Sequence, residues 1–308
     1  MSLRPPSLEV LLLLRAARET GALEALMRTA ATPSELCEQT ELTERGARIL
    51  IDVLEAEGFL KRVRDSYEPT NRSLGFLAKT DVRSIGSLPA TLDRLDRGFE
   101  LDETLCTDAL RPIDARERRN NLGAQAAVDE ATARAVVTEI VRTAPDATRV
   151  LEISGAPGRY AVELASRGLE VTLTDTPARL ADSKAILAGK SVRPLEAATP
   201  ADMPAERFDI IVGIEYASRC GPETTRELVE RATDVLEPGG WLVLVERLEG
   251  EGATRRAVEL LLETDAGRVY DGDRYLEWFE ACGLEETTVS TIPGTGFHAI
   301  AGRWPLDG

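Results

Sequence analysis

The sequence predicts an α/β protein in which a doubly wound, parallel sheet follows a smaller, mainly helical unit. Three observations support this prediction. From Arg149 onward, strand patterns alternate with helical patterns, an order that is typical of parallel sheets. Segments such as Ile210–Val212 and Trp241–Val245 are apolar almost throughout, as a sheet covered on both faces requires. A Pro-Gly-Thr-Gly turn at 293–296 separates two terminal strand patterns, which predicts an antiparallel hairpin.

The first part of the chain has the pattern of three helices followed by a strand pair. Each helix is predicted to begin after a residue suited to an N-terminal cap, namely Ser7, Thr32 and Thr43. Two short strand patterns follow, at 59–63 and 67–70. We interpret this order as a winged-helix module, which serves either DNA binding or a structural role as a dimerisation or lid domain. The third helix carries more acidic than basic side chains, which disfavours phosphate contact and favours the structural role.

The first helix begins with an almost continuous apolar stretch, Leu8 and Val10–Leu14. A helix with one solvated face would carry fewer apolar residues, so we expect this stretch to be buried against a second copy of the chain. The prediction is a homodimer formed largely through residues 1–100. Because Arg15 ends the stretch far short of the about 20 residues that cross a bilayer, we expect no membrane segment and no signal peptide.

The second part is predicted to begin with a helix at 124–143. The elements expected after it are, in order, 150–153 (strand), 158–167 (helix), 170–174 (strand), 177–188 (helix), 208–214 (strand), 222–236 (helix) and 241–245 (strand). A final helix at 274–282 precedes the hairpin strands at 285–291 and 297–303.

The composition limits the functions that the chain can have. With 37 Lys and Arg against 53 Asp and Glu, the net charge is −16, which disfavours nucleic acid and anionic membrane surfaces as partners. Many carboxylates beside very few lysines resemble the composition of salt-adapted, halophile-like cytoplasmic proteins. The four cysteines lie far apart and His298 is the only histidine. We therefore expect reduced thiols, no metal site and no Ser-His-Asp hydrolase.

A candidate ligand-binding loop follows the first strand of the sheet, at residues 152–158. The strand leads into small residues and then a helix, so backbone can approach a ligand closely and helix N–H groups point at it. The dinucleotide pattern G-x-G-x-x-G is not met in this loop. The phosphate-binding pattern G-x-x-x-x-G-K-[ST] fails at Lys184, where its first glycine would stand. What remains is a carboxylate near the end of each of two strands, Glu152 and Asp175.

That arrangement resembles S-adenosylmethionine-dependent methyltransferases with the Rossmann-like fold, whose loop reads acidic-x-Gly-x-Gly-x-Gly. The Pro-Gly-Gly turn at 238–240 and the terminal hairpin are also similar to that family. The resemblance implies S-adenosylmethionine as cofactor, with Asp175 accepting its ribose hydroxyls and Glu152 acting on its ammonium group. It implies cofactor-binding roles for Gln125, Glu152, Ser154, Gly155, Ala156, Gly158, Asp175, Thr176, Asp202 and Met203.

More narrowly, a winged helix joined to this sheet resembles small-molecule O-methyltransferases, which dimerise through their N-terminal half. The resemblance implies a dimerisation domain at 1–100, a helical linker and lid at 101–143, and an S-adenosylmethionine-binding methyltransferase domain at 144–308. In that family the general base is usually a histidine just after the fourth strand, where this chain has Glu215. Glu246 matches a carboxylate that flanks the base, so both are implied to be catalytic.

We therefore expect methyl transfer to a small hydroxylated molecule, with oxygen as the acceptor atom. In-line attack on a methyl group depends on positioning and water exclusion more than on strong acid–base groups. Ser154 and Ala156 replace glycines of the family loop, and no histidine stands at the position of the base. The alternative is a catalytically impaired, methyltransferase-like scaffold, or a ligand-responsive regulator that acts through its winged helix.

Overall fold

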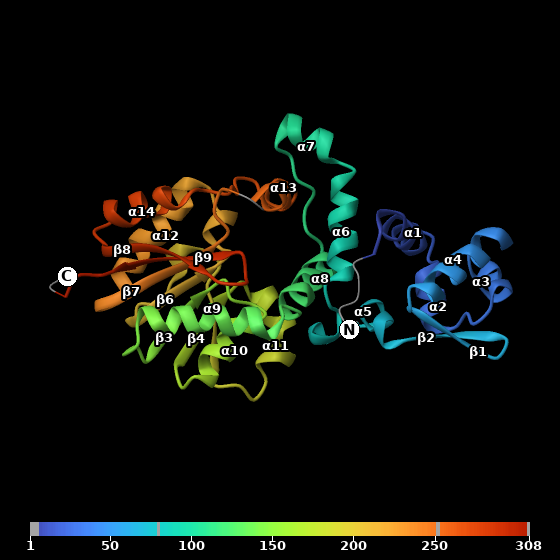
Figure 1. The fold of residues 1–308 in the computed structure, drawn as a ribbon, viewed down its shortest axis with the longest axis horizontal. Helices are drawn as coiled ribbons and strands as arrows, with labels where there is room; N and C mark the ends of the chain where they lie inside the picture. The colour runs from blue at the N-terminus through green and yellow to red at the C-terminus, as the bar shows by residue number, and fades with distance from the viewer. Residues whose placement is uncertain (1–5, 79–80, 251–252, 307–308) are drawn as a thin grey trace.

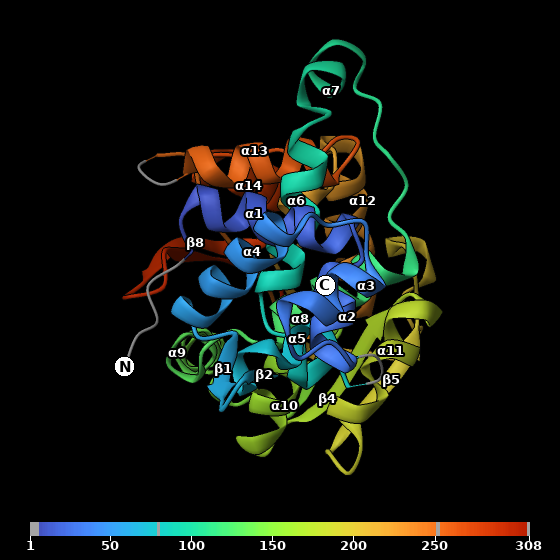
Figure 2. The ribbon, with the colours of Figure 1, turned by 90° about the vertical axis from the view of Figure 1, so that its right-hand side faces the viewer.

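The structure, a computed structural model, describes residues 6–78, 81–250 and 253–306. A sheet unit and an N-terminal helical unit lie on opposite sides of a connecting region (Figure 1). This region contains α6 (Leu88–Gly98), α7 (Leu101–Thr107) and α8 (Ala115–Ala126). In both views α7 projects away from the rest of the molecule, whereas α6 and α8 lie between the two units (Figure 2). Within the described ranges, no helix is long and apolar enough to cross a membrane.

The N-terminal unit contains the predicted helices and strand pair. Its elements are α1 (Leu8–Glu19), α2 (Ala22–Arg28), α3 (Pro33–Gln39), α4 (Glu44–Ala56), β1 (Leu60–Val63) and β2 (Ser66–Pro69), the strands being antiparallel. The caps are confirmed, because Ser7, Thr32 and Thr43 each accept a backbone N–H of the first turn. Helix α2 was not predicted. It separates from α1 at Gly21, whose φ of 73° turns the chain.

The helix predicted at 124–143 is wrong in its bounds. Helix α8 already ends at Ala126, and α9 (Glu130–Thr143) starts afresh. The break forms because the Asp129 carboxylate accepts hydrogen bonds from the backbone N–H (2.9 Å) and hydroxyl (2.7 Å) of Thr132. A capping carboxylate of this kind begins a helix and does not belong to a helix interior. The short helix α5 (Leu74–Leu77) and the 3-10 turns η1 (Asn71–Ser73) and η2 (Val82–Ser84) follow β2 along the chain.

The sheet unit has the predicted doubly wound topology. Its strands, among the described residues, are β3 (Arg149–Ile153), β4 (Glu170–Asp175), β5 (Val192–Glu196), β6 (Phe208–Ile214), β7 (Leu236–Glu246), β8 (Glu285–Ile292) and β9 (Phe297–Arg303). They lie in the order β5-β4-β3-β6-β7-β9-β8. All neighbouring strands from β5 to β7 are parallel, while β9 runs antiparallel to both β7 and β8. The terminal hairpin is therefore confirmed.

Five helices besides α9 accompany these strands in the part of the chain that the structure describes. They are α10 (Arg159–Ser166), α11 (Pro177–Leu187), α12 (Pro222–Val235), α13 (Ala253–Glu263) and α14 (Gly272–Ala281). Strand β5 and helix α13 were not predicted. Strand β5 is an edge strand with mostly exposed side chains and a proline at position 194, so it lacks the apolar pattern of the inner strands.

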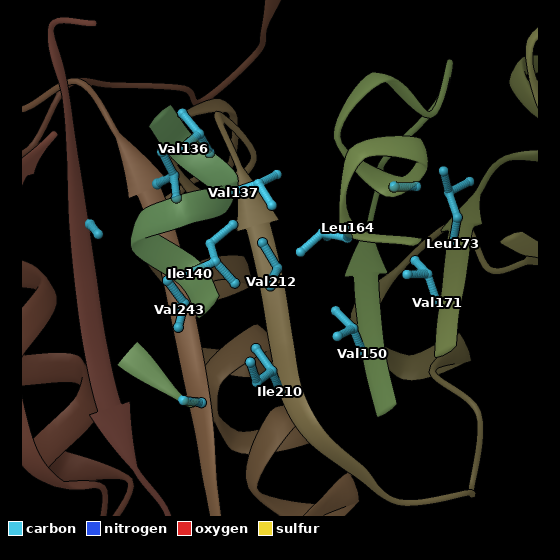
Figure 3. Close-up of a cluster of buried hydrophobic side chains, with 14 of the residues drawn as sticks. Val136, Val137, Ile140, Val150, Leu164, Val171, Leu173, Ile210, Val212 and Val243 are labelled. Carbon is cyan, nitrogen blue, oxygen red and sulfur yellow. The ribbon is translucent and has the colours of Figure 1, made fainter. Parts of the chain in front are cut away.

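The core consists of two apolar layers, one on each face of the sheet. One layer joins α9, through Val136, Val137 and Ile140, to side chains of β3, β4, β6 and β7 (Figure 3). The other joins α12 and α14 to the alternate side chains of β3, β6 and β7, such as Ile211. Because successive strand residues face opposite layers, the central strands are buried on both sides. Polar side chains are therefore concentrated where the strands end.

Candidate active site

A cavity of about 810 Å³ lies at the carboxyl ends of the parallel strands. Its walls come from the segments that follow β3, β4, β6 and β7, and from α6, α8 and α13. The chain runs outward from β3 towards β5, and in the opposite direction from β6 towards β7. Open parallel sheets bind ligands in the crevice at such a reversal of strand order. The cavity is therefore the candidate active site.

The loop after β3 packs so tightly that it requires small residues. A Cβ atom added to Gly155 would lie 2.7 Å from Cδ of Glu152, closer than real side chains approach. The Gly155 N–H donates to the Thr174 carbonyl (3.1 Å), which ties the loop to β4. Ser154 adopts a φ of 52°, a left-handed conformation that favours glycine. The backbone at this position therefore keeps the conformation that favours glycine, although the residue is serine.

Glu152 is buried at the inner wall of the cavity. Its side chain extends from the end of β3, the residue is 1% exposed, and its Oε2 atom has no hydrogen-bond partner among the described residues. Burial and, secondly, the charge of Asp175 raise the pKa of Glu152 to about 8. The carboxyl group is therefore mostly protonated at neutral pH. A cationic group placed beside it would satisfy the free oxygen and favour its ionised form.

Asp175, at the end of β4, is also buried but has partners. Its carboxylate accepts the backbone N–H groups of Thr176 (2.8 Å) and Ala156 (3.1 Å) and the Nε–H of Arg179 (3.0 Å). The Nη2 group of Arg179 donates further to Gln125 Oε1 (3.0 Å) and to the Ala156 carbonyl (2.9 Å). Sequence reasoning missed Arg179, although its position one helical turn after Asp175 is a recognisable ion-pair spacing.

Most residues that the sequence singled out line this cavity. These are Gln125, Glu152, Ser154, Gly155, Ala156, Asp175, Thr176, Met203 and Glu215. Gly158 lies just outside and begins α10, where an added Cβ atom would meet Leu187 at 2.5 Å. Asp202 is turned away, because its carboxylate caps the 3-10 turn η3 (Pro200–Asp202) through the backbone N–H (3.0 Å) and hydroxyl (2.8 Å) of Thr199.

The two predicted catalytic carboxylates have different environments. Glu215 follows β6 with a left-handed φ of 50°, lines the cavity, and pairs with Arg247 (3.4 Å) and Arg256 (3.8 Å). Glu246 ends β7 and is fully buried behind the wall. It accepts the backbone N–H of Ser218 (3.2 Å) in the 3-10 turn η4 (Ala217–Arg219). Burial raises the pKa of Glu246 to about 7. Glu215 can therefore meet a ligand, whereas Glu246 can support the turn beside it.

A group of arginines on the cavity wall was not predicted. Among the described residues its members are Arg94, Arg219, Arg247, Arg255 and Arg256, and Glu259 and Glu263 of α13 lie beside them. They come from α6, η4, the end of β7 and α13, which are far apart in the sequence. The spacing of Arg255 and Glu259 is an ion-pair signal within one helix, but it does not show that the helix faces a cavity.

Comparison with known proteins identifies a family. A family model described as a methyltransferase domain matches residues 124–289. The tetracenomycin polyketide synthesis 8-O-methyl transferase TcmO of Streptomyces glaucescens is 25% identical over an alignment 299 residues long, which covers 88% of this chain and 86% of that protein.

Solved structures share the fold over almost the whole chain. PigF with SAH has a TM-score of 0.71 at 18% identity and covers 95% of each chain. The mitomycin 7-O-methyltransferase MmcR has a TM-score of 0.71 at 17% identity, covering 96% of this chain and 94% of its own. Human N-acetylserotonin methyltransferase in complex with SAM has a TM-score of 0.71 at 18% identity, covering 96% of this chain and 94% of its own.

Ser154→Gly should stabilise the protein, because glycine adopts the left-handed conformation without the cost that a Cβ atom imposes. After the greater flexibility of glycine in the unfolded chain is subtracted, we expect a gain of about 0.5–1 kcal/mol in the free energy of unfolding. Urea denaturation followed by tryptophan fluorescence would measure it. Asp108→Gly, at a φ of 54° in the connecting region, is the matched control and should gain less, because aspartate tolerates this conformation better. A loss of stability in Ser154→Gly would contradict the argument.

Proposed function

Because the chain belongs to the family of proteins with a methyltransferase domain, we propose that it methylates a hydroxyl oxygen of a small molecule. S-adenosylmethionine-dependent methyl transfer is the activity of the family. Oxygen as the acceptor is supported by the relatives TcmO and MmcR, which are named for O-methyl transfer. The observation that carries the proposal is a buried carboxyl group with one unpartnered oxygen, Oε2 of Glu152, in the same cavity as an accessible carboxylate, Glu215.

The loop after β3 and its neighbours fit the cofactor. When bound, S-adenosylmethionine supplies a methyl group on a positively charged sulfur, which makes that methyl open to attack by oxygen. The free Oε2 atom of Glu152 would accept hydrogen bonds from the ammonium group. Gly155 lets the loop backbone lie close to the Glu152 side chain, where a Cβ atom would not fit. Met203, with Ala198 and Thr199, would provide the wall against which the adenine packs.

Asp175 would accept the ribose hydroxyls, but three hydrogen bonds already occupy it. A carboxylate has about four acceptor positions, so two hydroxyls require one of these bonds to be given up. The two backbone N–H groups are held by the loop, whereas the Arg179 side chain can turn. Arg179 keeps its bonds to Gln125 and to the Ala156 carbonyl when it releases Asp175. We infer that the cofactor displaces only the Nε–H bond.

Glu215 is the group we assign as proton acceptor. Its carboxylate lines the cavity and is about one third exposed, so a substrate hydroxyl can reach it. Glu215 would accept the proton that the substrate hydroxyl loses when its oxygen takes up the methyl group. Glu246 is assigned a positioning role, because it holds the Ser218 N–H and with it the turn that follows Glu215.

Binding of S-adenosylhomocysteine should release close to one proton per site at pH 7. The pKa of Glu152 is about 8 without a ligand, and a neighbouring ammonium group would lower it. Affinity should accordingly rise as the pH increases from 6 to 8, because deprotonation costs less there. Calorimetric titrations in buffers of different ionisation enthalpy would count the protons. In Glu152→Gln the release and the pH dependence should both disappear. Proton release that persists in this variant would remove Glu152 from the site.

Glu215→Gln should reduce methyl transfer by about 10²-fold or more, since a positioned general base contributes that much. Its affinity for S-adenosylhomocysteine should stay within about twofold, because the base does not hold the cofactor. The rate of S-adenosylhomocysteine formation with a panel of hydroxylated aromatic acceptors would measure the first effect. Glu237→Gln, on the part of β7 away from the cavity, is the control. Cofactor binding without turnover of any acceptor by the unaltered protein would favour the scaffold or regulator.

The apolar face of α1 supports the homodimer. Leu8 and Leu12 are 60% and 40% exposed, although they belong to an almost continuous apolar stretch. Helices α3 and α4 with β1 and β2 follow the order of a winged helix, and we assign this unit to dimerisation. Leu8→Glu/Leu12→Glu should convert a particle of twice 33.5 kDa into a monomer in sedimentation experiments. Val289→Glu, an exposed apolar site on β8, should leave the dimer intact. A dimer that survives the double substitution would place the interface elsewhere.

A further inference from the structure

The cavity carries positive charge inside a strongly acidic protein. The net charge of the chain is −16, yet the described residues on the cavity wall include eight arginines and five carboxylates. One of these carboxyl groups, Glu152, has its pKa raised to about 8 by burial and by Asp175, and so adds little negative charge at neutral pH. A surplus of guanidinium groups within a cavity attracts anions and repels cations.

Five of these arginines form a network of ion pairs with Glu215 and with two glutamates of α13. In this network Arg94 pairs with Glu259 (3.1 Å) and Glu263 (3.0 Å), and Arg219 pairs with Glu263 (3.2 Å). Burial alone would raise the pKa of Glu263, but the charges of Arg219 and Arg94 hold it below its ordinary value. Each glutamate is thus shared by more than one arginine, and the arginines outnumber the acids.

Arg256 is the member of this group with spare donors. It lines the cavity, is only 8% exposed, and its Nε and Nη2 atoms have no hydrogen-bond partner in the described chain. Its ion-pair distances, 3.8 Å to Glu215 and 3.7 Å to Glu259, are too long for hydrogen bonds. Nε and Nη2 form the edge of a guanidinium that donates two parallel hydrogen bonds to one carboxylate. A buried cation with this edge unpaired is costly unless a ligand completes it.

We propose that the substrate carries a carboxylate, which Arg256 binds through this edge with Arg219 and Arg247 beside it. The proposal rests on the proposed function, because it places the acid group next to the base. Arg256 and Arg247 both pair with Glu215, so a substrate carboxylate on Arg256 brings a nearby hydroxyl to Glu215. The substrate class is accordingly a hydroxylated acid whose hydroxyl and carboxylate are close neighbours, such as an aromatic ring with both groups on adjacent carbons.

The test compares two ligands of nearly the same size and shape, the anionic 3-hydroxy-2-naphthoate and the neutral 3-hydroxy-2-naphthamide. Their affinities are measured by naphthalene fluorescence with the full chain saturated with S-adenosylhomocysteine. We expect the carboxylate to bind about tenfold more tightly or better, since charge-assisted, bidentate bonds replace neutral ones. In Arg256→Gln this preference should fall below about threefold, with circular dichroism unchanged. Arg226→Gln is the control, because Arg226 forms an exposed ion pair with Glu230 on α12, and this variant should keep the full preference.

Arg247→Gln provides a second variant should Arg256→Gln fail to fold, and it should lower the preference as well. Equal affinity for the two ligands, no binding of either at millimolar concentration, or a preference that survives in the folded arginine variants would overturn the proposal. The prior titration with S-adenosylhomocysteine separates the two levels. If that ligand does not bind, the proposed function fails. If it binds and the carboxylate is not preferred, only the present inference fails.

Discussion

The position of the site depends on one constraint, which is that apolar layers cover both faces of the sheet. Strands β3 and β6 lie between two apolar layers, so polar side chains are costly along their length and are tolerated mainly near their ends. Glu152 is close enough to the end of β3 to reach the cavity and still deep enough to be buried with the strand. The burial that stabilises the sheet therefore also keeps this carboxyl group neutral until a cation approaches.

The inner strands could be predicted from the sequence because burial on both faces leaves a continuous apolar pattern. Strand β5 could not, since only one neighbour and one layer constrain it, and its side chains are largely exposed. Helix α13 was also missed, although it is amphipathic, with Leu260 and Leu262 buried and its arginines and glutamates on the cavity side. Its pattern could have indicated the helix, but not that the charged face lines a cavity.

The site was predictable where a residue stands at a strand end. Glu152, Asp175 and Glu215 all line the cavity because parallel strands bring their carboxyl ends to one edge. Asp202 does not line the cavity, because local hydrogen bonds with Thr199 hold its carboxylate as the cap of its own turn. The arginine group could not be predicted at all, since α6 and α13 meet only after the chain has folded. The positive charge of the cavity wall is a property of the tertiary structure, and it is opposite in sign to the net charge of the chain.

The connecting helices tie the N-terminal unit to the cavity wall through buried charge. Asp93 of α6 is 3% exposed and accepts Arg18 Nη1 of α1 (2.6 Å) on one side and Asn120 Nδ2 of α8 (2.7 Å) on the other. Taking away one partner of such a buried pair costs about 3–5 kcal/mol. The two units are consequently not exchangeable modules. An N-terminal unit grafted from another chain would have to present a guanidinium where Arg18 stands, or the helix that carries Arg94 into the cavity would lose its anchorage.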